Sequence, residues 1–369
     1  MRLGEICQDN LETRDPARES NSPFVYVDIS SVDAQSKQIV DSKQLLGKDA
    51  PSRARKVIKA NDIIVATTRP NLNAVAIVPE NFNNQICSTG FCVLRPSIDL
   101  NASYLFFFVR TGEFVKSLSN LVKGALYPAV TDNQVKSQLI PLPPLAEQER
   151  ISRILNEQMA AAAKARTAAE ARLEAARALP EAYLRKFFEN EGSRKWQKVR
   201  LGDILRVKSG NFLPANNMNT SGKYPVYGGN GINGYHDNFM FDEPKIIIGR
   251  VGAQCGCICV SEPNSWITDN ALYVSDKLKP FDDAFMTLLL KKLDLNSKAN
   301  SMAQPLVSGK IIYDIETSLP DVDEQKQIAV SIHKIYGEIE ALFVGIQEEL
   351  ETINILPVTL LQQAFSGGL

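Results

Sequence analysis

The 369-residue chain repeats a set of short motifs at a constant separation of 177 positions. The matched pairs include Pro128 and Pro305, Glu147-Gln148 and Glu324-Gln325, Leu179-Pro180 and Leu356-Pro357, and Phe188 and Phe365. Residues 2–6 and 200–204 also match, but at a separation of 198. Self-similarity at a fixed period is the signature of duplicated structural units. The sequence therefore predicts a tandem duplication, in which shared parts do one job twice and divergent parts act on different targets.

The best-matched parts of the two copies have helical periodicity. In the second copy, large apolar residues step by three or four positions: Ile328, Ile332, Ile335, Ile339, Leu342, Ile346, Leu350 and Ile353. The equivalent face of the first copy carries small residues: Ala162, Ala165, Ala169 and Ala176. Large side chains facing small ones allow close packing. We expect the two helices to pair with each other; the alternative is that each packs only on its own domain.

Each helical segment contains a proline, Pro180 in the first copy and Pro357 in the second. Proline lacks the backbone donor that continues a helix, so we expect both helices to kink or restart at these positions. The stretch from Glu147 to Leu179 alone predicts a rod about 50 Å long at about 1.5 Å per residue.

The divergent parts of the two copies are rich in short β-prone runs separated by Gly, Pro, Asn and Asp. These runs are residues 24–29, 63–66, 245–248 and 271–274. β-branched and aromatic residues favour strands, and the intervening residues favour turns. We therefore predict an α+β fold in which two strand-rich domains, 1–144 and 191–319, are joined by helical spacers, 145–190 and 320–369. The two long helices are expected to be antiparallel, related by a pseudo-twofold, and to form a coiled coil.

Charge is balanced overall but unevenly distributed along the chain. There are 41 basic and 42 acidic residues, which argues mildly against a strongly basic nucleic-acid binder. Locally, residues 194–223 hold seven basic residues and one acid, and residues 53–59 hold four basic residues and no acid. Two basic regions, one in each half, are typical of two nucleic-acid contact surfaces, although solvated faces of an ordinary protein remain the alternative.

Composition also bears on location. The longest aromatic and aliphatic run, residues 104–109, is far shorter than the ~20 residues that span a bilayer. No apolar stretch of the signal-peptide kind comes after Met1. We expect a cytoplasmic chain without membrane contact, in which the six cysteines are reduced thiols.

The loops of the divergent parts supply candidate DNA contacts. Arg, Asn and Gln side chains make bidentate hydrogen bonds to guanine and adenine edges, and basic side chains bind phosphates. The predicted DNA-contacting residues are Arg53, Arg69 and Asn73 in the first half, and Lys208, Asn211, Tyr227, Asn230, Asn233, Tyr235, Arg250 and Gln254 in the second half. Among them, Lys208 and Arg53 are expected to touch phosphate.

Catalytic motifs are poorly supported. Residues 229–234 fit a dinucleotide-binding fingerprint, but residues 235–244, directly after them, do not have the pattern of a helix, so no helix N-terminus is available for a pyrophosphate. The chain has only two histidines, His236 and His333. We therefore predict no catalytic, cofactor-binding or metal-binding residues.

Five motifs together resemble those of the specificity subunit of type I restriction-modification systems. They are Leu142-Pro143-Pro144-Leu145-Ala146-Glu147-Gln148-Glu149-Arg150-Ile151, its counterpart at residues 319–328, Leu361-Gln362-Gln363-Ala364-Phe365-Ser366-Gly367, Gly249-Arg250-Val251-Gly252 and Thr268-Asp269-Asn270. The resemblance extends over essentially the full length. The first copy departs from it, since Thr67-Thr68-Arg69-Pro70 aligns with Gly249-Arg250-Val251-Gly252.

The resemblance implies a non-catalytic subunit with two target recognition domains that bind a bipartite site in double-stranded DNA. It implies two methyltransferase subunits as partners, which use S-adenosylmethionine, and, where present, two restriction/translocase subunits, which use ATP and Mg. No cofactor is expected in this chain. Two alternatives remain: a stand-alone adenine DNA methyltransferase, and a coiled-coil scaffold that does not bind DNA.

Overall fold

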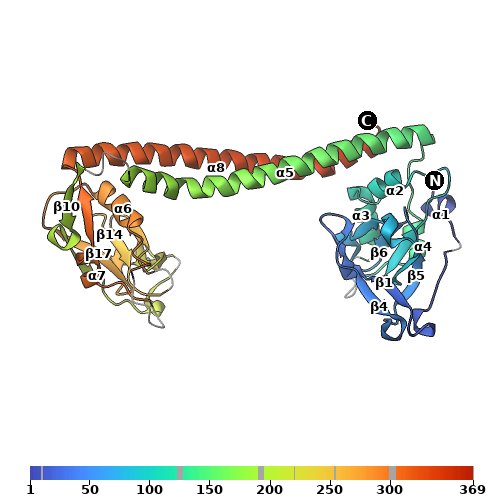
Figure 1. The fold of residues 1–369 in the computed structure, drawn as a ribbon, viewed down its shortest axis with the longest axis horizontal. Helices are drawn as coiled ribbons and strands as arrows, with labels where there is room; N and C mark the ends of the chain where they lie inside the picture. The colour runs from blue at the N-terminus through green and yellow to red at the C-terminus, as the bar shows by residue number, and fades with distance from the viewer. Residues whose placement is uncertain are drawn as a thin grey trace. The chain divides into compact units, whose positions relative to one another are not determined.

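The computed structural model describes residues 1–9, 11–122, 128–189, 195–219, 221–252, 255–298 and 305–368. They form two compact units, Met1–Glu170 with Glu348–Leu369, and Ala171–Gln347. Each unit combines one strand-rich body with parts of both long helices (Figure 1). The predicted division at residues 144, 190 and 319 stays a prediction, because it separates bodies from helices and the compact units do not. In the described part of the chain, no helix has the length and apolarity needed to span a bilayer.

The two long helices are α5 (Leu145–Phe188) and α8 (Val322–Phe365). Each has 44 residues and is therefore about 66 Å long at about 1.5 Å per residue. Both helices continue through their prolines, Pro180 and Pro357, so the predicted restart is wrong. The turns after Pro180 carry Leu184 and Phe188, which are buried in the core of the second unit. This packing stabilises the helical conformation after Pro180, where one backbone hydrogen bond is missing.

Helices α5 and α8 pair in both units, as the sequence predicts (Figure 1). In the first unit, Ile151 and Leu155 near the start of α5 share a core with Leu361 and Ala364 near the end of α8. In the second unit, the Arg177 guanidinium lies 5.8 Å from the Phe343 ring centre, and the Tyr336 hydroxyl donates to the Pro180 carbonyl at 3.4 Å. Residues with higher numbers on α5 contact residues with lower numbers on α8, so the two helices are antiparallel.

The buried seam of this pair repeats every seven residues. Its members are Leu155, Ala162, Ala169 and Ala176 on α5, and Ile332, Ile339, Ile346 and Ile353 on α8. The predicted alanine and isoleucine faces are therefore confirmed, with two corrections: Ala165 and Leu342 are exposed. A pair of helices encloses only a narrow stripe of each surface, and these two residues lie outside it.

The first body contains two main sheets and a short hairpin. One sheet has the order β4 (Lys43–Leu46), β1 (Pro23–Val27), β8 (Gln85–Ser88) and β5 (Ala54–Ile58); the other has the order β7 (Val75–Ile77), β6 (Ile63–Ala66) and β9 (Phe91–Leu94). The hairpin is β2 (Val32–Asp33) with β3 (Gln38–Ile39). Strand β1 is parallel to β8, with Tyr26 opposite Ile86. The α-helices are α1 (Leu3–Ile6), α2 (Ala102–Phe108), α3 (Gly112–Leu121) and α4 (Asp132–Lys136).

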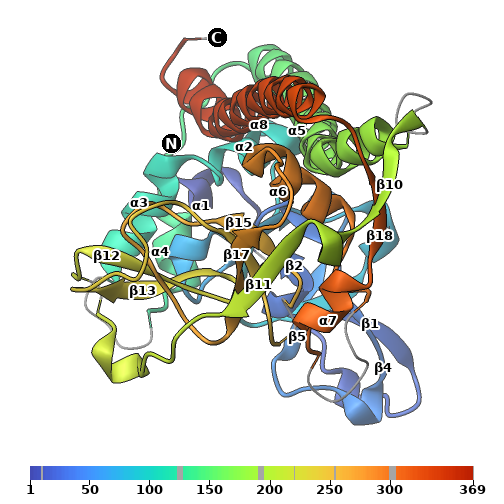
Figure 2. The ribbon, with the colours of Figure 1, turned by 90° about the vertical axis from the view of Figure 1, so that its left-hand side faces the viewer.

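The second body repeats this plan with differences at the sheet edges. One sheet has the order β13 (Gly231–His236), β12 (Tyr224–Gly228) and β16 (Trp266–Ile267), and β12 is parallel to β16 as β1 is to β8. The other has the order β11 (Leu205–Ser209), β17 (Ala271–Lys277), β14 (Ile246–Gly249) and β15 (Ile258–Val260). The remaining elements are β10 (Gln197–Arg200), β18 (Glu316–Leu319), α6 (Asp283–Lys292) and α7 (Gly309–Tyr313). Figure 2 shows α6 between this sheet and α8. The four predicted strands are confirmed as β1, β6, β14 and β17.

The repeated Glu-Gln motif has a structural explanation in its glutamine. Gln148 is fully buried: its Oε1 accepts from the Asn101 N–H that precedes α2 at 2.9 Å, and its Nε2 donates to the Asp99 and Pro143 carbonyls. Gln325 does the same in the second body, accepting from Asp282 N–H at 2.9 Å and donating to the Pro320 carbonyl. Each glutamine therefore connects the first turn of a long helix to the N-terminus of a shorter α-helix, α2 in the first body and α6 in the second.

We expect Gln148→Leu to destabilise the first unit by about 1 to 3 kcal/mol, because it leaves buried backbone groups without partners. Gln325→Leu should act likewise on the second unit. Urea unfolding of the full chain measures the loss. The matched control is Gln158→Leu, at an exposed position of α5, which should change stability by less than about 0.5 kcal/mol. Equal stability of Gln148→Leu and the control would show that the hydrogen bonds do not hold the helix.

Candidate nucleic-acid interface

Four loops of the second body meet around residues 268–270, between β16 and β17. The Thr268 N–H donates to the Tyr227 carbonyl at 2.8 Å, which brings in the end of β12. The Arg250 N–H donates to the Asn270 carbonyl at 3.0 Å, and the Gly210 N–H donates to the Ala271 carbonyl at 3.1 Å. The ends of β11, β12 and β14 are therefore fixed to one point of the body.

Arg250 is the cation at this meeting point. Its Nη1 donates to Ser209 Oγ at 3.2 Å and to the Asp269 carbonyl at 3.3 Å, and the residue is half-buried. Within the described ranges no carboxylate lies within 4.0 Å of its guanidinium. Arg250 is therefore oriented by neutral oxygens and not by an ion pair, which suits a bidentate contact with a base or a phosphate.

The hairpin of β12 and β13 presents several predicted contacts to solvent. Asn230 at its turn and Asn233 and Tyr235 on β13 are all exposed. A Cβ on Gly228 would collide with the Asn233 side-chain amide, so glycine allows this amide to lie across the hairpin. Tyr227 is the exception. It is buried in a core with Ile247 and Ile267, and its hydroxyl accepts from the Glu262 N–H at 3.1 Å.

The prediction for Tyr227 is therefore corrected: this side chain supports the hairpin and does not present its ring to solvent. An exposed aromatic residue outside the predicted set is Phe212, which is 72% exposed. It comes directly after the exposed Asn211. Lys208 is exposed and lies 3.8 Å from the Asp276 carboxylate, a loose pair that leaves it accessible. Gln254 lies outside the described residues.

The predicted residues of the first body are brought together by the turn between β8 and β9. The Thr89 N–H donates to the Arg53 carbonyl at 2.9 Å, and the Gly90 carbonyl accepts from the Thr67 N–H at 2.9 Å. Arg69 and Asn73 flank the short 3-10 helix η4 (Pro70–Leu72) just beyond Thr67. Arg53 and Arg69 are exposed, and Asn73 is half-buried.

Backbone contacts show which residues of the two bodies are equivalent. Thr68 bridges Ala129, and Val251 bridges Leu306. The Thr67 carbonyl accepts from Val130 N–H, as the Arg250 carbonyl accepts from Val307 N–H. Thr67 therefore corresponds to Arg250, and Arg69 corresponds to Gly252. The sequence alignment of Thr67–Pro70 with Gly249–Gly252 is wrong by one residue, because the amino-acid sequence does not show which backbone groups pair.

Arg69 thus occupies a position that is glycine in the second body. Both residues have left-handed backbone conformations, with φ of 49° for Arg69 and 89° for Gly252. This region costs a residue with a side chain about 1 to 2 kcal/mol. Non-glycine residues held in such conformations are concentrated at functional sites. The two arginines, Arg69 and Arg250, consequently extend from different positions of a shared framework.

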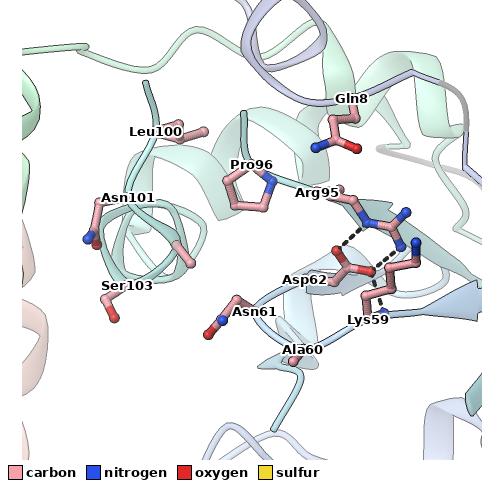
Figure 3. Close-up of a pocket in the computed structure, with 11 residues that line it drawn as sticks. Gln8, Lys59, Ala60, Asn61, Asp62, Arg95, Pro96, Leu100, Asn101 and Ser103 are labelled. Carbon is pink, nitrogen blue, oxygen red and sulfur yellow. Dashed lines mark hydrogen bonds and ion pairs between the residues drawn. The ribbon is translucent and has the colours of Figure 1, made fainter. Parts of the chain in front are cut away.

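A pocket on the first body has features that resemble a catalytic site but have a structural explanation (Figure 3). Its buried carboxylate, Asp62, accepts from Arg95 Nε and Nη2 at 2.8 and 2.7 Å and from Lys59 N–H at 2.8 Å. These three hydrogen bonds, two of them from Arg95, explain the buried carboxylate as a structural ion pair. Cys87 and Cys92 of the same body do not line this pocket. Burial raises the pKa of their thiols to about 12, which keeps them protonated. No cluster of metal-binding side chains occurs among the described residues.

A family model described as the type I restriction modification DNA specificity domain matches residues 1–170 and again residues 193–352. The chain belongs to this family. The two matches cover both bodies and the starts of both long helices, which agrees with the duplication. The type I specificity family therefore accounts for the shared motifs of the two copies.

Curated and solved members of the type I specificity family resemble the chain. The EcoprrI specificity subunit of Escherichia coli is 32% identical over 153 residues, and the HindI specificity subunit of Haemophilus influenzae is 26% identical over 139 residues. These alignments span 40% and 37% of this chain, and only 36% and 27% of the relatives.

Solved structures match over the whole chain. The HsdS subunit from Thermoanaerobacter tengcongensis is 31% identical, with a TM-score of 0.76 over 100% of this chain and 96% of that one. A chain from a structure concerning complex assembly and conformational transition of the type I R-M system is 30% identical, with a TM-score of 0.82 over 100% and 97%. The fold of two strand-rich bodies on two long antiparallel helices is therefore that of the family.

We expect Arg69→Gly to separate stability from recognition. Glycine relieves the left-handed backbone, so stability should stay within about 1 kcal/mol of the parent or rise. Loss of the guanidinium should remove about 1 to 3 kcal/mol of base discrimination from one half-site only. The readouts are thermal unfolding and a map of methylated sites made with the methyltransferase partner.

The matched control is Asn84→Gly. Asn84 is also left-handed, with φ of 60°, but it lies at the end of β8 opposite the turn that carries Thr89. This variant should leave the methylation map unchanged. If Arg69→Gly gave the parental map as well, the assignment of Arg69 to the interface would be wrong.

Proposed function

We propose that the chain is the DNA-specificity subunit of a type I restriction-modification system, binding a bipartite DNA target and positioning methyltransferase subunits on it. The observation that carries this proposal is the double match to the specificity domain, with each copy placing its own set of divergent loops on a shared framework. The chain itself performs no chemistry in this proposal. S-adenosylmethionine belongs to the methyltransferase partner, and ATP and Mg belong to a restriction partner.

Two different half-sites are favoured by the differences between the bodies. Arg250 in the second body corresponds to Thr67 in the first, and Arg69 corresponds to Gly252. The sheet edges differ too. In the first body β5 adds an edge to the sheet that contains β1 and β8, whereas in the second body β11 adds an edge to the sheet that contains β14 and β17. Base-reading side chains that extend from different positions cannot present the same hydrogen-bonding pattern to the major groove. We therefore expect two unrelated half-sites.

Helix α8 offers a surface for the protein partners. Several apolar side chains outside its buried seam are exposed: Val330, Leu342, Val344, Ile355 and Val358. Exposed apolar residues in such number on one helix favour contact with another protein. Two methyltransferase subunits, one for each copy, would match the duplication. Restriction/translocase subunits and a cytoplasmic location remain part of the proposal.

The helix pair is also proposed to set the spacing of the target. Helices α5 and α8 connect the two bodies, so their length determines how many base pairs lie unread between the half-sites. At about 1.5 Å per helical residue and about 3.4 Å per base pair, a change of one helical turn corresponds to one or two base pairs.

Mapping methylated adenines in a genome that expresses this chain with its methyltransferase partner tests the proposal. We expect two short, different half-sites separated by an unspecified gap of fixed length. Replacing residues 1–140 with those of a relative should change one half-site and leave the other as an internal control. A contiguous or palindromic site would contradict the proposal.

The two alternatives are tested by binding measurements on the full chain. A stand-alone adenine methyltransferase would bind S-adenosylmethionine without a partner, whereas we expect no binding in a calorimetric titration. A scaffold without DNA contacts would leave a duplex probe unbound at low salt, whereas we expect binding that weakens steeply as salt increases.

A further inference from the structure

Two cations on the first body lack acidic partners. Lys37, at the end of the β2–β3 turn, is half-buried, and its Nζ donates to the Asn73 carbonyl at 2.5 Å. Arg110, between α2 and α3, lies with its guanidinium carbon 5.0 Å from the Phe106 ring centre and 5.4 Å from that of Phe107. Neither side chain has a carboxylate within 4.0 Å in the described part of the chain.

Arg110 is held in place without being neutralised. Its Nε is buried and has no hydrogen-bond partner among the described residues. Burial lowers the pKa of its guanidinium to about 10. A half-buried cation without an acidic partner is costly, and its contacts with the two aromatic rings offset only part of this cost.

Lys37 is positioned by its own turn and by its bond to Asn73. It has a left-handed backbone with φ of 60°. Burial lowers the pKa of Lys37 to about 8, repulsion from Arg110 contributes to this lowering, and Asp33 opposes it slightly. The Asp33 carboxylate accepts from the Gln35 and Ser36 N–H groups, so it caps its own turn. Lys37 and Arg110 are therefore like charges that repel one another.

The cluster adjoins the candidate interface. The Asn73 carbonyl that anchors Lys37 belongs to the loop of Arg69 and Asn73, and α3 packs against η4 in that loop. The turn also contacts the long helix, since the Gln35 side-chain amide lies 2.8 Å from Arg166 Nη1 and 3.2 Å from Nη2. Two cations without acidic partners thus lie at the loop whose residues are predicted to read bases.

We propose that Lys37 and Arg110 form an anion site that binds a backbone phosphodiester of the DNA, next to the bases contacted from the Arg69–Asn73 loop. The inference rests on the proposed function and names residues that the sequence did not single out. A phosphate supplies the negative charge and the acceptor oxygens that the pair lacks. Because phosphate contacts position a protein without reading sequence, this site fixes the register of the first body on its half-site.

The test compares Lys37→Met and Arg110→Met with the parent in the full chain bound to duplex DNA. Each variant should weaken binding to target and non-target duplexes by about the same factor, on the order of tenfold. Each should also reduce the slope of log affinity against log salt by about 0.9. The methylation map should be unchanged.

The variant that binds DNA more weakly should be the more stable protein. This combination distinguishes a ligand site from a structural one, because loss of a structural contact would lower stability. The pKa of Lys37 is lower in the folded chain than in the unfolded chain, so its charge destabilises the fold fully below pH 8 and progressively less above it. Lys37→Met should therefore raise the melting temperature at pH 7, with a gain that shrinks towards pH 10. Parental DNA affinity should fall between pH 7 and pH 9, as Lys37 loses its proton, and this fall should be smaller in Lys37→Met.

The matched controls are Lys48→Met and Arg18→Met, which remove the same charges from η3 (Gly47–Asp49) and η1 (Pro16–Arg18), where both residues are exposed. An equal loss of salt slope in the controls would overturn the site, because overall charge would explain the effect. An unchanged salt slope in both test variants would also overturn the site.

If the parent chain itself failed to bind DNA, the proposed function would fail first. Inorganic phosphate at millimolar concentration should raise the melting temperature of the parent more than that of Arg110→Met; equal shifts would also contradict the site.

Discussion

Each long helix begins in one unit and ends in the core of the other, and the fold depends on this exchange. Gln148 fixes the start of α5 to the first body, and Phe188 at its end packs 5.5 Å from Phe285 in the second. Gln325 fixes the start of α8 to the second body, and Phe365 at its end packs 5.0 Å from Tyr104 in the first. Neither body has a complete core without a helix end supplied from the other copy.

This exchange explains why some parts of the two copies are alike and others are not. Residues that join helix to body must satisfy the same buried groups twice, so glutamine and phenylalanine recur at matched positions. The loops that face outward have no such requirement. They share only the backbone pairing that fixes Thr67 and Arg250, and the side chains placed on that framework differ. A frame of constant geometry can therefore carry two separately varying recognition surfaces.

The sequence was sufficient to predict the features that depend on periodicity. The helical seam repeats every seven residues, and the duplication repeats every 177 positions, so pairing of the helices and the four strands could be predicted. It failed where tertiary packing overrides local preference. Pro180 does not end α5 because Leu184 and Phe188 are anchored beyond it, and Tyr227 is buried because its strand is central in its sheet.

The candidate interface was predictable only in part, for the same reason. The accessibility of Arg69, Lys208 and Asn233 could be predicted from turn composition, since glycine- and asparagine-rich loops lie at the surface. The Lys37 and Arg110 pair could not be predicted, because the two residues reach the loop of η4 only in the fold, Lys37 from a hairpin and Arg110 from the connection between α2 and α3. Neither could the equivalence of Arg69 with Gly252, which is visible only in backbone hydrogen bonds and φ.

The central claim is that one helix pair carries both recognition surfaces and determines the spacing of the two DNA half-sites. Inserting four residues into α5 near Ala163 and four into α8 near Ile353 lengthens both helices by one turn and keeps them matched. The methylation map of this double insertion should show both half-sites unchanged and the gap longer by one or two base pairs. An unchanged gap in a folded, active double insertion would contradict the account, because the helices would then not set the distance.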